Sequence, residues 1–197
     1  MDDLLKKVEE VLPTLEGWCT FEKGRALAEL VAVQRPKVCV EIGVFGGRSL
    51  IAMALACKKF GGHVHGIDPW TAGASLEGDS DQGNKEYWGN LDYAYVYRSF
   101  VKAVTDQDLL EVCDWYRMGS ERAVHLFGQI DVLHIDGNHT EEVSCRDVKL
   151  YAPKIPRGGH LWFDDTDWKT TSRAQQLIRR DFDLMKMVGT CALYRKK

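Results

Sequence analysis

The sequence lacks the features that would direct it to nucleic acid or to a membrane. Its 197 residues carry 26 basic and 29 acidic side chains, a net charge of −3, and the two signs are mixed along the chain. A protein that binds nucleic acid or an anionic surface usually concentrates Lys and Arg in one patch or stripe. No segment approaches the roughly 18 uninterrupted apolar residues of a membrane span. We therefore expect neither partner.

Secretion signals and paired cysteines are also missing. Asp2 and Asp3 stand where a secretory signal would have a basic start followed by an apolar run. The cysteines form no CxxC pair, and several lie in apolar runs, where a free thiol packs as a small hydrophobic group. We interpret them as reduced thiols of a cytoplasmic protein. They are Cys19, Cys39, Cys57, Cys113, Cys145 and Cys191.

What is present is an alternation of apolar runs and helical patterns, which predicts one α/β domain over residues 1–197. We expect a doubly wound, mostly parallel seven-stranded sheet with helices on both faces. The predicted strands are 37–42, 63–67, 111–118, 130–135, 160–163, 182–188 and 191–194. The predicted helices are 2–11 and 21–34 (both within an N-terminal segment, 1–35), then 49–60, 91–105, 121–126, 141–152 and 171–180.

The last two strands are separated only by Gly189 and Thr190, which is too short for a helical crossover. They should form a hairpin and give the sheet an antiparallel edge. Residues 71–90 are polar and rich in glycine, and we expect a long loop. Connections of this length are usually functional, so residues 71–97 are a candidate lid over a substrate.

The first strand ends in a glycine-rich turn, Glu41-Ile-Gly43-Val-Phe45-Gly-Gly-Arg-Ser49. In a doubly wound sheet, ligands bind at the carboxyl ends of the strands, and glycines let a ligand approach the backbone closely. The helix that follows offers unpaired N–H groups to a carboxylate. A dinucleotide fingerprint would need glycine at position 41, where this chain has an acid that could accept a hydrogen bond from an amine. A plain strand-to-helix turn would have a similar pattern.

Asp68 ends the second strand. An acid there can accept hydrogen bonds from both hydroxyls of a ribose, which supports an adenosine ligand without choosing between cofactors. The alternative is a turn aspartate before Pro69.

Acids also follow two later strands: Asp136 ends one, and Asp164 and Asp165 end the next. In adjacent parallel strands these carboxylates would converge and repel one another, which raises some of their pKa values. A divalent cation such as Mg²⁺ would relieve that repulsion. In the alternative, Asp165 caps the following turn and only Asp136 faces the cleft.

His139 lies three residues after Asp136. An imidazole with an ordinary pKa of about 6.5 can take a proton from a hydroxyl within hydrogen-bond reach. It could instead be a histidine at a helix start, satisfied by a carbonyl or an acid. His63 and His65 flank a buried valine and are interpreted as structural or surface residues.

In their order and spacing these motifs resemble the class I S-adenosylmethionine-dependent methyltransferases, from about Gly17 to the terminal hairpin. Within them the chain is similar to the metal-dependent small-molecule O-methyltransferases, which include catechol O-methyltransferase and the sugar O-methyltransferases of macrolide and aminocoumarin biosynthesis. The resemblance implies a Rossmann-like class I methyltransferase fold. It also implies two cofactors, S-adenosylmethionine and Mg²⁺ or another divalent cation.

The resemblance implies roles for particular residues. Glu41, Gly43, Phe45 and Ser49 would surround the methionine part of the cofactor, with Thr20 closing over its carboxylate. Asp68 would hold the ribose, and Ser120 and Glu121 the adenine. The metal ligands would be Asp136, Asp164 and Asp165, and the catalytic residues His139 and Asp136. The chain departs from the catechol-type pattern at Asp165, where those enzymes have Asn, and at His139, where they have a lysine base.

The reaction expected from these assignments is metal-assisted methyl transfer to a hydroxyl of a small molecule, a sugar or a phenol. Aromatic side chains of the predicted lid could stack on the acceptor, although part of the tyrosine set could be helix core. They are Trp70, Tyr87, Trp88, Tyr93, Tyr95 and Tyr97. Three alternatives stay open: a metal-independent methyltransferase, a hydroxylase-type oxidoreductase and a non-catalytic cofactor-binding protein. The acceptor, the metal and the oligomeric state, a homo-oligomer included, stay open as well.

Overall fold

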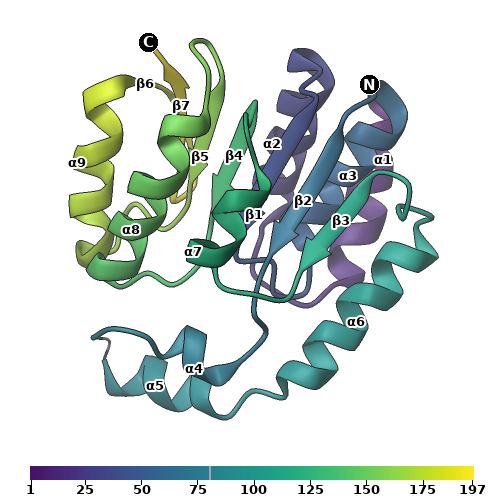
Figure 1. The fold of residues 1–197 in the computed structure, drawn as a ribbon. Helices are drawn as coiled ribbons and strands as arrows, with labels where there is room; N and C mark the ends of the chain where they lie inside the picture. Colours follow the sequence, from purple (N-terminus) through teal and green to yellow (C-terminus); the bar gives the residue numbers. More distant parts are fainter. Residues whose placement is uncertain (80) are drawn as a thin grey trace.

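A seven-stranded sheet forms the centre of the computed structural model, which describes residues 1–79 and 81–197 (Figure 1). The strand order is β3-β2-β1-β4-β5-β7-β6. The strands are β1 (Val38–Ile42), β2 (His63–Ile67), β3 (Cys113–Tyr116), β4 (Val132–Ile135), β5 (His160–Phe163), β6 (Phe182–Val188) and β7 (Cys191–Lys196). The first five are parallel, and β7 pairs antiparallel with both β5 and β6. The predicted fold class and its terminal hairpin are confirmed.

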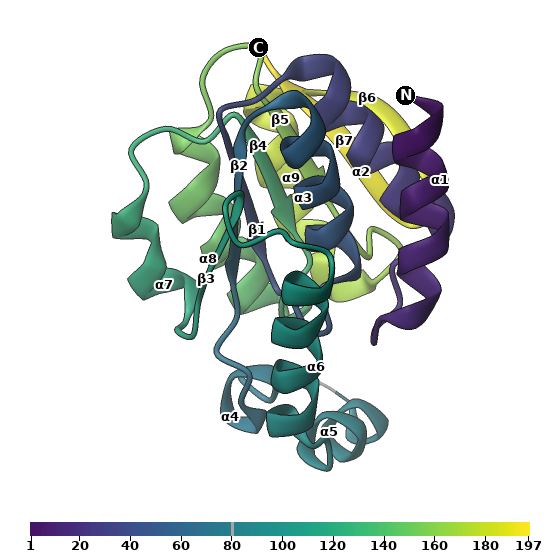
Figure 2. The same cartoon turned by 90° about the vertical axis from the view of Figure 1, so that its right-hand side faces the viewer.

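Helices cover both faces, because successive side chains of each buried strand point to opposite sides of the sheet and both sets are apolar. One core packs against α1 (Asp2–Val11), α2 (Phe21–Gln34), α3 (Arg48–Phe60) and α6 (Tyr93–Asp106). The other packs against α7 (Ser120–Ala123), α8 (Glu141–Tyr151) and α9 (Ser172–Asp181). Figure 2 shows α1, α2 and α3 on the side of the sheet opposite α7 and α8. Short 3₁₀ turns occupy Leu12–Thr14, Val124–Leu126, Ala152–Lys154 and Lys169–Thr171. None of the helices in the described ranges is both long and apolar enough to cross a membrane.

The stretch predicted as a long loop is different in the structure. It contains two short helices, α4 (Ala72–Ser75) and α5 (Gln82–Gly89), and residue 80 lies outside the described residues. The prediction was wrong because residues typical of loops cap these helices: the Thr71 hydroxyl accepts a hydrogen bond from the Ala74 N–H, and the Asp81 carboxylate accepts one from the Asn84 N–H. Both helices lie beyond the carboxyl ends of the strands, as Figures 1 and 2 show.

Candidate functional site

The turn after β1 has a backbone conformation that requires glycine at position 43. Gly43 has a φ of +86°, and a Cβ atom there would lie 2.1 Å from the carbonyl oxygen of Asp136. Phe45 and Trp70 also have positive φ values, of 50° and 47°. Such conformations cost a non-glycine residue on the order of 1–3 kcal/mol, so the surroundings must hold them in place.

Hydrogen bonds to Asp68 fix this backbone conformation. Its Oδ2 accepts hydrogen bonds from the N–H groups of Val44 (3.0 Å) and Phe45 (2.9 Å), and its Oδ1 accepts one from the N–H of Trp70 (2.7 Å). The Trp70 indole N–H in turn donates to the Phe45 carbonyl at 2.9 Å. Burial raises the pKa of Asp68, and the three backbone hydrogen bonds only partly oppose this. The residue predicted to hold a ribose therefore also shapes the turn.

Glu41 lies beneath the turn rather than in a cavity wall. It is fully buried, its Oε1 accepts a hydrogen bond from the Ser49 hydroxyl at 2.6 Å, and its Oε2 lies 3.4 Å from His134 Nδ1. Burial alone would lower the pKa of His134, but the charge and hydrogen bond of Glu41, together with the charges of Asp136 and Asp164, outweigh it and the pKa is raised. Glu41 thus supports Ser49 from below. His134 has no recognisable sequence signal, because it occupies one position of an otherwise apolar strand.

Two cavities, of about 360 and 430 Å³, lie along the carboxyl ends of the strands. Both are lined by Gly43, Phe45, Asp136 and His139, so they adjoin at the glycine turn. Their volumes suit small-molecule ligands. The first cavity extends to Asp68, Ser120, Glu121, Arg146 and Asp147. The second extends to Trp18, Lys23, Ser49, Asp164 and Asp165.

The far end of the first cavity is organised around a buried carboxyl group. The Ser120 hydroxyl donates to Asp147, and the Tyr151 hydroxyl donates to the Ser120 carbonyl at 2.7 Å. Burial raises the pKa of Asp147 to about 6, although the hydrogen bond from Ser120 opposes the shift. Glu121 is exposed, and one carboxylate oxygen lies 4.0 Å from Arg146. Sequence reasoning missed Asp147, which reads as an ordinary polar residue of a helix.

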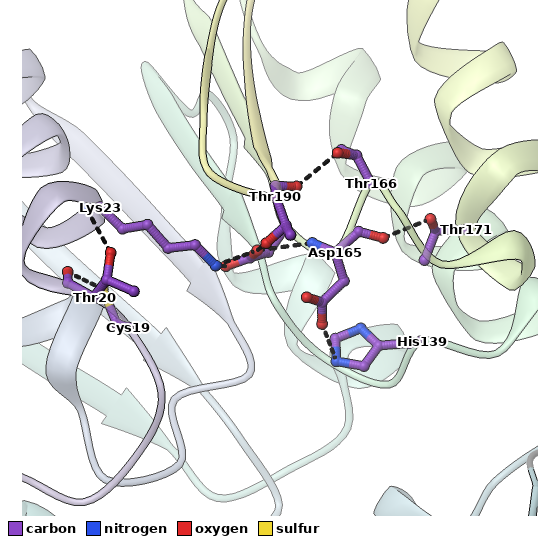
Figure 3. A network of polar contacts seen from close by, with 9 residues as sticks. Cys19, Thr20, Lys23, His139, Asp165, Thr166, Thr171 and Thr190 are labelled. Atoms are coloured by element: carbon purple, nitrogen blue, oxygen red, sulfur yellow. Dashed lines mark hydrogen bonds and ion pairs between the residues drawn. The ribbon is translucent and has the colours of Figure 1, made fainter.

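In the second cavity, an ammonium group lies against the acids. Lys23 Nζ donates to both oxygens of Asp164, at 2.7 and 3.0 Å, and Asp164 Oδ1 also accepts from the Asp165 N–H at 2.7 Å. Figure 3 shows the Lys23 side chain extending towards Asp165. Burial would raise the pKa of Asp164, but the charge of His134, the hydrogen bonds from Cys191 and Lys23 and the charge of Lys23 together outweigh it and lower the pKa to about 2. The sequence gives no signal that Lys23 would reach this position.

The three predicted metal ligands lie at the same edge of the sheet, yet they divide into two groups. Ligand atoms of Asp136, His134 and Asp164 lie within 4.8 Å of one another, and so do those of Asp136, His139 and Asp165. No such group in the described part of the chain unites all three carboxylates. Asp136 belongs to both groups, and burial together with the charge of Asp164 raises its pKa well above its ordinary value.

His139 contacts an acid, as one reading of the sequence anticipated. Its Nε2 lies 2.8 Å from Asp165 Oδ2 (Figure 3). Its ring centroid lies 5.0 Å from that of Trp168. It also lines both cavities, so it remains accessible to a ligand. Asp165 makes a turn as well, since its carbonyl accepts hydrogen bonds from the Trp168 N–H and the Thr171 hydroxyl.

Thr20 caps a helix. Its hydroxyl accepts a hydrogen bond from the Lys23 N–H at the start of α2, and its side chain is not part of the lining described for either cavity. The contact of Thr20 with a cofactor carboxylate stays a prediction.

The six predicted aromatic residues lie in three places, and Trp18 and Phe45 join two of them. Trp18, Phe45, Tyr87 and Trp88 form one cluster at the second cavity, with ring centroids 5.0–5.9 Å apart. Trp70 instead stacks on Phe100 in the core, with centroids 5.4 Å apart. Tyr93, Tyr95 and Tyr97 lie on α6, and the hydroxyl of Tyr93 donates to the Trp88 carbonyl at 2.9 Å.

The helices above the cavities are tied to the loop before α8. Asn138 Nδ2 lies within hydrogen-bond distance of the carbonyls of Ala74, Ser75 and Glu77, at 3.1, 3.2 and 2.9 Å. Arg146 of α8 forms a two-pronged ion pair with the Glu77 carboxylate. These contacts hold α4 over the first cavity.

Comparison with known proteins bears on what this site does. Residues 40–166 match a family model described as a methyltransferase domain. The solved structure of the O-methyltransferase NovP is similar over 100% of this chain and 97% of its own, with a TM-score of 0.76 and 14% identity. The O-methyltransferase TomG from Streptomyces achromogenes, involved in tomaymycin synthesis and solved with SAM, is similar over 100% of this chain and 91% of its own (TM-score 0.63, 16% identity). An O-methyltransferase from Bacillus cereus, solved with SAH, is similar over 100% of this chain and 92% of its own (TM-score 0.60, 15% identity). No curated protein matches the sequence.

Proposed function

Because this chain belongs to the methyltransferase domain family, we propose that it transfers the methyl group of S-adenosylmethionine to a hydroxyl of a small molecule. The observation that carries the proposal is the pair of adjoining cavities, which meet at the glycine turn and end at the acids that follow β4 and β5. One cavity would take the nucleoside and the other the acceptor, with the methyl group between them. NovP, TomG and the Bacillus cereus protein, all named as O-methyltransferases, share the fold.

The residues present fit this cofactor. Ser120 and Asp147 would face the adenine, Asp68 would lie near the ribose, and the turn from Gly43 to Ser49 would take the methionine part. The close approach of Gly43 to the Asp136 carbonyl leaves no room for a side chain there, and the N–H groups at the start of α3 suit a carboxylate. When bound, S-adenosylmethionine supplies a methyl group that is reactive because it is attached to a sulfonium.

The chain's own part is to position the acceptor and to take its proton. His139 and Asp136 line both cavities, and either could accept the proton of the acceptor hydroxyl. Asp165 orients the His139 ring through the 2.8 Å contact. The cluster of Trp18, Tyr87 and Trp88 offers aromatic faces to a phenol or to the apolar face of a sugar.

Replacing His139 by Gln tests the base. If the imidazole takes the proton, kcat falls by about 10² or more, which is the usual contribution of a positioned base, while the Kd of S-adenosylmethionine changes little. Rapid-quench or steady-state kinetics with a methylated product readout measure this. An unchanged kcat would transfer the role to Asp136.

A site in which Asp136, Asp164 and Asp165 together bind Mg²⁺ does not fit the contacts, because both oxygens of Asp164 already bind Lys23. A metal-assisted form remains a second candidate, and the grouping of Asp136, His139 and Asp165 favours it. Activity measured before and after EDTA treatment, with Mg²⁺ or Mn²⁺ added back, separates the two forms.

The experiment that tests the function uses methyl-labelled S-adenosylmethionine with panels of phenols and sugars. The proposal expects S-adenosylhomocysteine and a labelled acceptor in equal amounts. A hydroxylase would consume acceptor without forming S-adenosylhomocysteine. A non-catalytic protein would bind the cofactor in calorimetry and leave it intact. We further propose a cytoplasmic location, in keeping with six free thiols.

A further inference from the structure

The ion pair between Lys23 and Asp164 was not predicted from the sequence, which suggested Asp164 as a metal ligand. Lys23 comes from the N-terminal segment, and its partner lies 141 residues later in the chain, at the end of β5. The side chains are 12% and 5% exposed, so the pair is largely removed from water. An exposed ion pair contributes little to the stability of the folded protein. A buried pair stabilises it only when the two groups are close enough to offset their loss of hydration. This pair has that geometry, with both carboxylate oxygens within 3.0 Å of Nζ.

The acids around this pair also contact basic side chains. Four acids meet at this edge of the sheet, and three of them contact a basic residue of the chain itself: Glu41 contacts His134, Asp165 contacts His139, and Asp164 contacts Lys23. The fourth acid is Asp136. Basic side chains of the protein therefore lie where the sequence suggested a divalent ion.

Lys23 also faces the place where the acceptor would bind. It lines the second cavity together with Asp136, Asp164 and the aromatic residues Trp18 and Trp88. An ammonium group has three N–H donors, and two of them are engaged by Asp164. The buried Cys191 thiol also accepts a hydrogen bond from the ammonium group, and because sulfur is a weak acceptor, a ligand oxygen can take this third donor.

We propose that the Lys23 ammonium replaces a divalent cation in this site, holding Asp164 and donating its third N–H to the acceptor oxygen. The inference rests on the proposed function for the identity of the acceptor. As the acceptor hydroxyl loses its proton to His139 or Asp136, the oxygen gains negative charge, and a fixed positive charge beside it stabilises that change. The oxygen then forms its bond to the methyl carbon as the bond from that carbon to sulfur breaks, and S-adenosylhomocysteine leaves.

Mn²⁺ binding tests the proposal without any acceptor. We expect wild-type protein to bind Mn²⁺ at least about tenfold more weakly than Lys23→Met, because removal of the ammonium exposes the Asp164 carboxylate to the cation. Calorimetry, or the electron paramagnetic resonance signal of free Mn²⁺, measures both constants. Lys23→Met/Asp164→Asn should lose the gained affinity. Arg25→Met, on the same helix but paired with Glu29 at the surface, is the matched control and should behave as wild type.

Turnover provides the second readout once an acceptor is found. EDTA-treated wild type should keep its activity, and Lys23→Met should lose about tenfold or more in kcat, with a Kd for S-adenosylmethionine close to that of wild type. Wild-type protein that binds Mn²⁺ as tightly as Lys23→Met, or that needs a divalent ion for turnover, overturns the proposal. The wild-type measurement stands even if the variant does not fold. Failure of methyl transfer with every acceptor would instead contradict the proposed function. The Mn²⁺ measurement would still test whether Lys23 occupies the place of a divalent cation.

Discussion

At the scale of single residues, this site is governed by carboxyl groups whose surroundings differ. Asp68 accepts three backbone hydrogen bonds, Asp164 contacts an ammonium group, and Asp147 accepts a hydrogen bond from a serine hydroxyl. The pKa of Asp164 accordingly falls to about 2, whereas that of Asp147 rises to about 6. Burial disfavours the charged form in each case, and the partners decide the outcome.

Asp147 makes stability depend on pH. Its pKa in the folded protein, about 6, lies above the ordinary value of 3.8, so the folded state binds the proton more tightly than the unfolded state. Asp147 therefore adds on the order of 3 kcal/mol to the free energy of unfolding at pH values below its ordinary pKa. This contribution is lost as the pH rises through the pKa of the folded state. Asp147→Asn keeps the acceptor for Ser120 but cannot ionise. Its melting temperature relative to wild type should therefore rise by about 5 °C or more between pH 4 and pH 7.

Thermal unfolding followed by circular dichroism at both pH values checks this. Taking the difference between variant and wild type removes the titration of all other groups. A difference that does not change with pH would contradict the assignment of a raised pKa to Asp147.

Asp68 should control the affinity for the cofactor. Asn at this position puts an N–H₂ group against backbone N–H donors, because one side-chain oxygen cannot accept from Val44, Phe45 and Trp70 together. Each buried hydrogen bond left unmade costs about 1–3 kcal/mol, so the Kd of S-adenosylhomocysteine should increase about tenfold or more. Isothermal calorimetry measures the constant. Asp106→Asn, at an exposed acid of α6 paired with Lys102, is the control and should leave it unchanged.

At the scale of elements, the two helices between β2 and α6 are held mainly by contacts from elsewhere in the chain. α4 has four residues and α5 eight, and none of them is buried. Isolated helices of this length are marginal in water. Their position over the first cavity depends on Asn138 and on the ion pair between Glu77 and Arg146.

Asn138→Ala should loosen this region without unfolding the domain. Loss of the contacts to the Ala74, Ser75 and Glu77 carbonyls frees the end of α4, so cleavage at Lys85 by trypsin should become several-fold faster. Limited proteolysis followed by mass spectrometry locates the cut. Gln129→Ala, which removes an exposed hydrogen bond to Asp131, should digest as wild type does. Equal cleavage rates for Asn138→Ala and wild type would show that Asn138 is not the tether.

At the scale of the whole molecule, one edge of the sheet collects residues from both ends of the chain. Lys23 comes from α2, Glu41 and Ser49 flank the glycine turn, and Asp164 follows β5. A ligand bound there contacts segments that are separate in the unfolded chain. Ligand binding should therefore stabilise the domain as a unit.

S-adenosylhomocysteine should raise the melting temperature. A ligand present at about 100 times its Kd adds about 2.7 kcal/mol to the free energy of unfolding, which corresponds to roughly 5–10 °C for a domain of this size. Differential scanning fluorimetry measures the shift. NAD is the informative control, since Glu41 stands where a dinucleotide site needs glycine. A larger shift with NAD than with S-adenosylhomocysteine would refute the choice of cofactor.

The sequence by itself determined the sheet, the turn and the position of the acids. Apolar β-branched runs specify buried strands locally, the short Gly189–Thr190 connection permits only a hairpin, and acids that follow parallel strands must meet at one edge. Gly43 and Asp136 could be found in this way because their signals lie within a few residues of each strand end. The helices of the 71–90 stretch could not, since their capping residues are also those of loops.

Only the tertiary structure decided which acid contacts which basic side chain. Lys23 looks like any surface lysine of an amphipathic helix until α2 packs on the sheet and brings its ammonium within 2.7 Å of Asp164. His134 and Asp147 likewise acquire their roles from neighbours on other elements. Charge interactions in a buried site depend on distances of a few ångströms between segments far apart in the chain, and local sequence patterns carry no information about those distances.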